Sequence, residues 1–169
     1  PEDADVFNNL GLVLHQQFKL DQAIEAYKKA IQIKPHYAEA FNNLGNALSA
    51  NKDTKRAIDS FYMAVAYNPE FAEASNNLGN AFHQMVKFEA EINAYRSAIK
   101  INRDYAESYY NMANALQGIG DLGQAIEAYQ NAIDIRPDYA EAYHNMGSAF
   151  QDEGKLDQAK EAYKSAIMF

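Results

Sequence analysis

The feature that most constrains this chain is an internal repeat with a period of 34 residues. The segment FNNLGNA at residues 41–47 returns as SNNLGNA at residues 75–81, and related segments begin at residues 7, 109 and 143. A repeat of this length cannot bury its own apolar residues alone, so neighbouring repeats must stack. The chain divides into the units 4–37, 38–71, 72–105, 106–139 and 140–169, the last of them shorter.

Each unit is predicted to form two helices. Large apolar residues stand at positions 4, 7 and 11 of a unit, as Phe41, Leu44 and Leu48 do in the second. Steps of three and four residues match one face of a helix and exclude a strand. A second run with the same spacing covers residues 57–65. Helix-breaking prolines stand near the ends of three units, at Pro35, Pro69 and Pro137.

Three pairs of residues have the spacing of a capping box, in which the side chains at the start of a helix satisfy backbone N–H groups. They are Asp104 with Glu107, Asp138 with Glu141, and Asp121 with Gln124. These pairs predict that helices begin at the three aspartates.

Small residues recur where the two helices of a unit are expected to meet. Glycine stands in the middle of the first helix, where it costs about 1 kcal/mol relative to alanine, at Gly11, Gly45, Gly79 and Gly147. We expect alanines at positions 20 and 27 of the second helix to offset this cost by allowing close approach. They are Ala23, Ala30, Ala57, Ala64, Ala125, Ala132, Ala159 and Ala166.

The third unit departs from this pattern, because Glu91 replaces the alanine at position 20. A carboxylate that is buried without a partner is costly. We therefore expect Glu91 to point outward, towards Lys87. The aromatic residues of the second helices are expected to form the core, as are those at the turns between units. The two series are Tyr27, Phe61, Tyr95, Tyr129 and Tyr163, and Tyr37, Phe71, Tyr105 and Tyr139.

This pattern resembles the tetratricopeptide repeat family along essentially the whole chain. The signature residues of the second unit are Phe41, Leu44, Gly45, Leu48, Ala57, Phe61, Ala64 and Pro69. The resemblance implies an all-α fold, an α-solenoid of antiparallel helix pairs that form a right-handed superhelix. It predicts a single array over residues 1–169.

In that family the first helix of each unit lines a concave groove, so the resemblance implies a peptide-binding site there. Asparagine donates and accepts hydrogen bonds, and a ladder of asparagines suits the backbone of an extended ligand. The residues expected to bind peptide are Asn9, Asn43, Asn77, Asn111, Asn145, Asn42, Asn46, Asn76, Asn80, Asn114, Tyr110 and His144. Asparagine is common at these positions in family members of unrelated specificity, so a structural role is the alternative.

An acidic row at position 2 of each unit accompanies the asparagines. It consists of Asp5, Glu39, Glu73, Glu107 and Glu141. The row favours a basic protein or peptide ligand, although carboxylates in a first helical turn also stabilise the helix macrodipole. The formal net charge of −8 repels phosphate backbones, so no nucleic-acid partner is expected.

No catalytic site is expected, and the chain is not predicted to be an enzyme. His15, His36, His83 and His144 form no metal-spaced pair on one helical turn. The sequence has no nucleophile elbow and no glycine-rich phosphate loop, so we expect no metal and no cofactor. No apolar run has membrane-spanning length and no signal-peptide pattern is present. We therefore expect no membrane partner and a cytoplasmic location.

The leading hypothesis is a protein–protein interaction scaffold that binds a peptide or partner segment in its groove. The alternative is the substrate-recognition arm of a larger enzyme, because the NLGNA segments look like the repeats of O-linked N-acetylglucosamine transferases. A third hypothesis is self-association through exposed terminal repeats, because the chain stops at the apolar residues Ile167, Met168 and Phe169.

Overall fold

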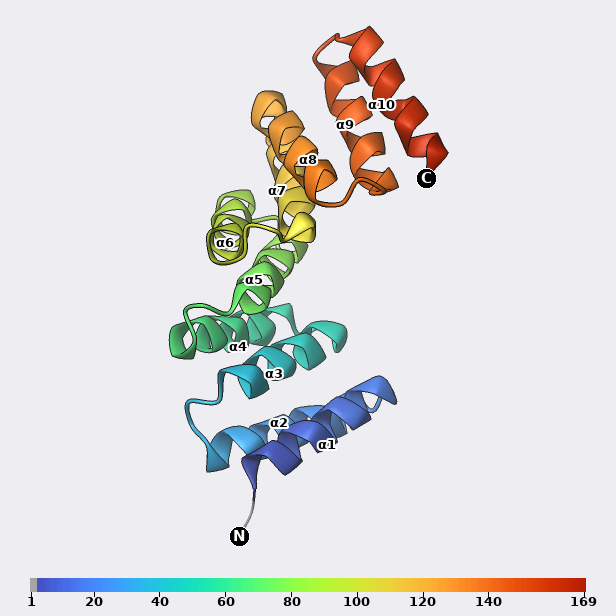
Figure 1. Ribbon diagram of the computed structural model, residues 1–169. Coiled ribbons are helices and arrows are strands. Elements are labelled where there is room, and N and C mark those ends of the chain that lie inside the picture. Colours follow the sequence, from blue (N-terminus) through green and yellow to red (C-terminus); the bar gives the residue numbers. More distant parts are fainter. Residues whose placement is uncertain (1–2) are drawn as a thin grey trace. The chain divides into compact units, whose positions relative to one another are not determined.

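A computed structural model describes residues 3–169, and this part of the chain is all-α, with ten helices (Figure 1). Two helices form in each of the five units, so the predicted helix pairs are confirmed. The helices are α1 (Ala4–Gln16), α2 (Leu20–Ile33), α3 (Ala38–Ala50), α4 (Thr54–Tyr67), α5 (Ala72–Gln84), α6 (Phe88–Ile101), α7 (Ala106–Gly118), α8 (Leu122–Ile135), α9 (Ala140–Asp152) and α10 (Leu156–Met168).

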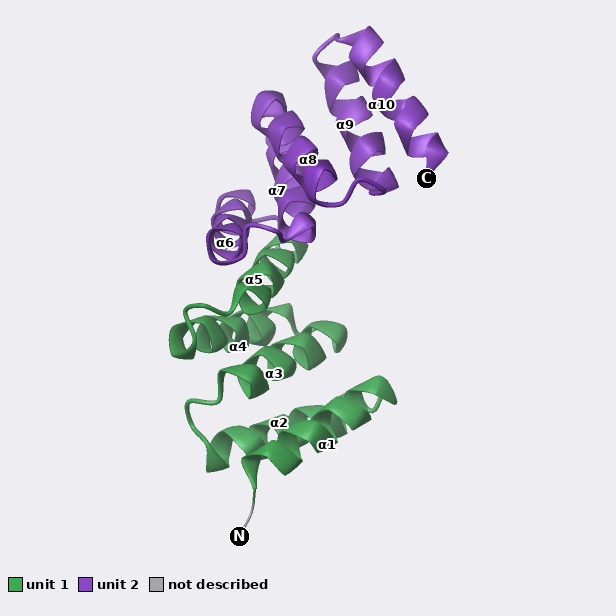
Figure 2. Cartoon of the chain, in the orientation of Figure 1, with its two compact units in different colours: residues 1–85 green, residues 86–169 purple. Residues whose placement is uncertain are grey.

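The helices group into two compact units (Figure 2). The first ends at Met85 and contains α1 to α5, and the second begins at Val86 and contains α6 to α10. The boundary therefore falls in the turn between the two helices of the third repeat. A single array over residues 1–169 stays a prediction, and each compact unit is described by itself.

Within each compact unit the helices stack in the same way. The helices of a repeat pack as antiparallel pairs, α1 with α2, α3 with α4, α7 with α8 and α9 with α10. Adjacent first helices also touch, whereas successive second helices of the same compact unit make no contact in the described residues. The first helices therefore form one continuous surface in each compact unit. We call it the inner face; it consists of α1, α3 and α5 in the first compact unit and of α7 and α9 in the second.

The turn inside each repeat contains one residue in the left-handed region. Its φ is 59° at Phe18, 62° at Lys52, 55° at Val86, 81° at Gly120 and 78° at Gly154. This conformation costs a residue with a side chain about 1–2 kcal/mol. The first three repeats therefore carry local strain that glycine removes in the last two.

Close packing in a helix pair depends on an aromatic ring that lies against a glycine. A Cβ atom added to Gly45 would lie 2.5 Å from Cε1 of the Phe61 ring. A Cβ atom added to Gly11 would likewise lie 2.5 Å from Cε1 of the Tyr27 ring. The alanines at positions 20 and 27 are largely buried, as expected, but the aromatic ring of the second helix occupies the space that the glycine leaves.

Replacing Gly45 by alanine tests this packing. The added Cβ would force the Phe61 ring to move, and overpacking of this kind costs about 1–3 kcal/mol. We expect Gly45→Ala to lower the free energy of unfolding, measured by denaturant titration, although alanine is the better helix former. A Cβ added to Gly123 in α8 would have no atom within 4 Å. Gly123→Ala should therefore raise the free energy of unfolding by up to about 1 kcal/mol. Equal effects of the two substitutions would contradict this explanation.

The prediction that Glu91 points outward is wrong. Its side chain is only 1% exposed on the core side of α6, whereas Lys87 is exposed. Ile92, Tyr95 and Ala98 are buried in the same helix. Rotating α6 to expose Glu91 would expose these apolar residues as well, so the apolar face of the helix sets its orientation. Burial and the Glu91 carboxylate both raise the pKa of the Tyr95 hydroxyl well above its usual range.

One of the three predicted capping pairs is confirmed. Asp121 caps α8 by accepting a hydrogen bond of 3.2 Å from the backbone N–H of Gln124, and the Gln124 side chain donates back to it. The other two predictions are wrong, because the N-cap residues of α7 and α9 are Tyr105 and Tyr139. Asp104 and Asp138 each stand one residue before the N-cap and accept a hydrogen bond through the backbone carbonyl instead. The carbonyl of Asp138 accepts from the backbone N–H of Ala140 at 2.9 Å.

Candidate functional site on the inner face

The predicted ligand-binding residues differ in their access to solvent. Asn9 and His144 are exposed, whereas Asn42 and Asn76 are each only 1% exposed. The remaining members are partly buried: Asn43, Asn46, Asn77, Asn80, Tyr110, Asn111, Asn114 and Asn145. All twelve lie on the first helices of their repeats. The buried asparagines therefore bond with the protein itself in this structure.

In the first compact unit, buried asparagines join each repeat to the next. The Nδ2 group of Asn8 in α1 donates to Oε1 of Glu39 in α3 over 3.2 Å. Nδ2 of Asn43 in α3 donates back to Oδ1 of Asn8 over 3.0 Å. The pattern recurs one repeat later among Glu73, Asn42 and Asn77, with distances of 3.1 and 3.0 Å. We call each set a Glu–Asn–Asn chain.

The carboxylate sets the direction of both amides in a Glu–Asn–Asn chain. An ionised carboxylate only accepts hydrogen bonds, so Asn8 must turn its Nδ2 group towards Glu39. The Oδ1 atom of Asn8 then faces Asn43, which must supply its own Nδ2 group. This leaves Oδ1 of Asn43 without a hydrogen-bond donor among the described residues. By the same reasoning Oδ1 of Asn77 is left as an acceptor.

Tyr37 lies near the first Glu–Asn–Asn chain, because Asn8 and Glu39 both influence the pKa of its hydroxyl. Burial, and next the nearby Asp5 carboxylate, raise the pKa of the Tyr37 hydroxyl well above its usual range. The sequence predicted a core role for Tyr37, and nothing in its spacing indicated that its hydroxyl would reach the polar residues of the inner face.

The second compact unit uses a different network. Position 5 of the fourth repeat is Tyr110 instead of asparagine, and Nδ2 of Asn145 donates to its hydroxyl over 3.0 Å and to Oδ1 of Asn114 over 2.9 Å. The buried Tyr129 hydroxyl is a donor to two side-chain oxygens. They are Oδ1 of Asn114 at 2.6 Å and Oε1 of Gln117 at 2.9 Å. Burial raises the pKa of Tyr129 well above its usual range. Oδ1 of Asn145 again remains an acceptor.

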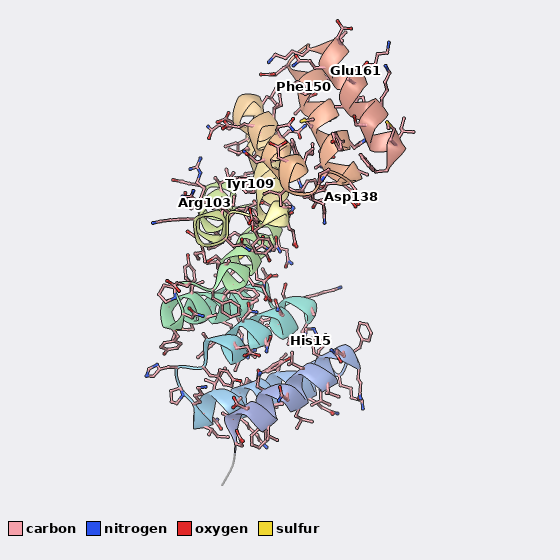
Figure 3. All side chains as sticks on the ribbon, in the orientation of Figure 1. His15, Arg103, Tyr109, Asp138, Phe150 and Glu161 are labelled. Atoms are coloured by element: carbon pink, nitrogen blue, oxygen red, sulfur yellow. The ribbon has the colours of Figure 1, made fainter. Side chains whose placement is uncertain are left out.

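The apolar core of the second compact unit holds this network in place. Leu116, Tyr129 and Met146 are buried at its centre. Partly buried aromatic side chains pack around them, among them Tyr109 on α7 and Phe150 on α9, which Figure 3 labels. The polar groups of the inner face are therefore attached to helices that the core fixes relative to one another.

Two further findings concern the requirements of a metal site and of a membrane-spanning helix. Residues 3–169 contain no group of three or more histidine, aspartate or glutamate side chains placed to hold a metal ion. In the same range no helix has both the length and the apolar character needed to cross a membrane.

The buried and partly buried asparagines are expected to differ in their effect on stability. Asn42→Ala removes a bond to Glu73 and leaves the amide of Asn77 without its acceptor, which should cost about 1–3 kcal/mol of unfolding free energy. Asn46 makes no hydrogen bond among the described residues, so Asn46→Ala should change stability by less than about 0.5 kcal/mol. Thermal and urea unfolding of both variants measure the difference. Equal losses would show that the Glu–Asn–Asn chain contributes nothing to stability.

The stacked antiparallel pairs define an α-helical repeat protein. A family profile described as TPR repeat matches residues 19–52, 87–120 and 119–154, and a second, described as tetratricopeptide repeat, matches residues 38–71. The matches span more than half of the chain, and the chain belongs to the tetratricopeptide repeat family. No curated protein matches the chain by sequence.

Solved structures agree with this assignment. A crystal structure of MamA is 32% identical, with a TM-score of 0.89 over 94% of this chain and 92% of that one. The structure of YrrB, described as a TPR protein with an unusual peptide-binding site, is 22% identical, with a TM-score of 0.83 over 98% of this chain and 85% of that one. PilF from Pseudomonas aeruginosa is 19% identical, with a TM-score of 0.87 over 98% and 75%. The family and the similarity to MamA support a protein-interaction scaffold, a role that is typically non-catalytic.

Proposed function

We propose that the inner face binds an extended polypeptide segment that is rich in hydrogen-bond donors and carries basic side chains. The observation that carries this proposal is the direction of the Glu–Asn–Asn chains. Each uses one N–H of each amide internally and leaves carbonyl oxygens, such as Oδ1 of Asn43 and Asn77, available. A ligand for such a surface must supply donors, which backbone N–H groups, lysine and arginine do.

The fixed amides favour binding because their side chains are already ordered. An immobilised side chain loses little further conformational entropy when a ligand arrives. Asn43 and Asn77 occupy equivalent positions of adjacent repeats, so they offer the same group at regular intervals. Each hydrogen bond contributes only about 1 kcal/mol, and several must therefore form together. The carboxylates of Glu39 and Glu73 lie beside these acceptors and favour a basic ligand.

The predicted residues take two roles in this proposal. Asn42 and Asn76 are buried, and they position other groups, as Tyr110 does by accepting from Asn145. The members with solvent access make the direct contacts. These are Asn9, Asn43, Asn46, Asn77, Asn80, Asn111, Asn114, His144 and Asn145.

The other hypotheses from the sequence have less support. The family matches and the similar structures support a scaffold, and they do not favour the substrate-recognition arm of a glycosyltransferase. Self-association through the terminal repeats stays a prediction, which the exposed side chains of Val6 and Ile167 support. A cytoplasmic location also stays a prediction.

Peptide arrays with lysine- and arginine-rich, neutral and acidic decapeptides, followed by calorimetry on the binders, test the proposal. The basic peptides should bind, and the double substitution Asn43→Ala/Asn77→Ala should weaken binding about tenfold or more through the loss of two acceptors. The matched control is Asn51→Ala/Asn131→Ala, which removes asparagines that bond to Asp21 and to the Glu127 carbonyl.

Circular dichroism before each titration ensures that only folded protein is compared. Unchanged binding by the Asn43→Ala/Asn77→Ala variant would contradict the proposal. Equal binding of the acidic and basic peptides would contradict it as well, because acceptor groups and carboxylates do not suit an acidic ligand.

A further inference from the structure

A cavity of about 580 Å³ lies in the second compact unit between α7, α9 and α10. It has three aromatic walls, Tyr110, His144 and Tyr163, and two polar ones, Glu141 and Asn145. The volume falls within the range of sites that hold small ligands. Four of these residues belong to the inner face, and Tyr163 belongs to the second helix of the last repeat.

The aromatic walls are held in place by other rings. The His144 and Tyr163 rings lie 5.4 Å apart between centroids at an angle of 56°. The Tyr110 ring packs against Tyr129 at 6.0 Å and against Tyr139 at 4.8 Å. The face of an aromatic ring attracts a cation through its quadrupole, and several rings around one space attract it from several sides.

The chain's own cations occupy other aromatic faces but not these. Lys29 lies over Phe7, Lys34 over Tyr37 and Arg136 over Tyr139, at 5.5, 4.2 and 3.2 Å from the ring centroids. In the described part of the chain no lysine or arginine lies over a ring that lines the cavity. Its aromatic faces are therefore available to a cation from outside.

The carboxylate of Glu141 is available for the same purpose. Glu39 and Glu73, its equivalents in the first compact unit, accept hydrogen bonds from Asn8 and Asn42 of the preceding repeat. The residue that corresponds to these asparagines is Tyr110, and Glu141 has no hydrogen bond or ion pair with any described residue. A single replacement, asparagine by tyrosine, thus frees a carboxylate and adds an aromatic wall beside it.

We propose that this cavity binds the guanidinium group of an arginine side chain. A planar guanidinium stacks on aromatic rings and donates two parallel hydrogen bonds to one carboxylate, here that of Glu141. Oδ1 of Asn145 provides a further acceptor. The inference rests on the proposed function only for the source of the arginine, a polypeptide that lies along the inner face.

Other cavities in the described part of the chain differ from this one. One of about 410 Å³ is lined by Tyr143, Phe150, Asp157 and Glu161, but the Glu161 carboxylate already pairs with Lys164 at 2.7 Å. The one in the first compact unit, about 340 Å³, is lined by Phe7 and acidic residues, but Lys29 of the chain itself also lines it. Another, of about 740 Å³, is lined by Lys87 and Arg96. The last two already contain a cation, so an arginine from a ligand has no comparable site there.

The test is an NMR titration of the isotope-labelled chain with N-acetyl-arginine methylamide and with its uncharged citrulline analogue. The arginine compound should produce saturable shifts of the Tyr110, His144 and Tyr163 ring signals. The citrulline compound should bind at least about tenfold more weakly. Glu141→Gln should weaken arginine binding about fivefold or more. The matched control Glu39→Gln alters the equivalent residue of the first compact unit and should leave these shifts unchanged.

A second variant, Tyr110→Asn, restores the residue type found at this position in the first three repeats. It removes one aromatic wall and gives Glu141 an internal partner, so arginine binding at the cavity should be lost. The chemical shifts of α8 show whether the Tyr110→Asn variant folds. If it does not, Glu141→Gln still tests the inference, because Glu141 is exposed and its substitution leaves the core unchanged.

The inference is overturned if citrulline and arginine bind equally well, or if Glu141→Gln behaves like Glu39→Gln. Either result is compatible with peptide binding along the inner face, so it leaves the proposed function intact. Conversely, arginine-specific shifts together with peptide binding that ignores Asn43 and Asn77 would support the cavity and contradict the proposed function.

Discussion

The contact between a glycine of the first helix and an aromatic ring of the second determines how closely the helices of a repeat pack. A side chain at Gly11 or Gly45 would overlap the ring of Tyr27 or Phe61. The helix pair formed in this way stacks on the next pair and buries position 5 of one repeat against positions 2 and 6 of the following one. The polar chemistry of the inner face thus depends on an apolar contact inside each pair.

That stacking turns ordinary asparagines into groups with a fixed direction. A free asparagine side chain offers a donor and an acceptor equally well, but the Glu39 carboxylate orients Asn8, and Asn8 orients Asn43. In the second compact unit, Tyr110 interrupts the pattern and leaves Glu141 beside aromatic rings. The same fold therefore presents a row of acceptors in one place and a cavity suited to a cation in another.

The sequence predicted the repeat length, the helix pairs and the positions of the asparagines, because these follow from a period that recurs along the chain. It did not predict the burial of Glu91, because the apolar face of α6 outweighs the cost of one carboxylate. The direction of the amides was also beyond prediction, since Asn8 and Glu39 are 31 residues apart and meet only after stacking. The predicted binding role of the inner-face residues depends on a ligand and stays a proposal.

Neutron diffraction from crystals of the deuterated protein would test the central claim most directly, because it locates the deuterons of side-chain amides. The structure predicts that the Nδ2 deuterons of Asn8 and Asn43 point to Glu39 and to Oδ1 of Asn8, and that Oδ1 of Asn43 faces the solvent. An Nδ2 group of Asn43 that faces the solvent instead would show that the inner face presents donors. That result would contradict both the direction of the Glu–Asn–Asn chains and the preference for a basic ligand.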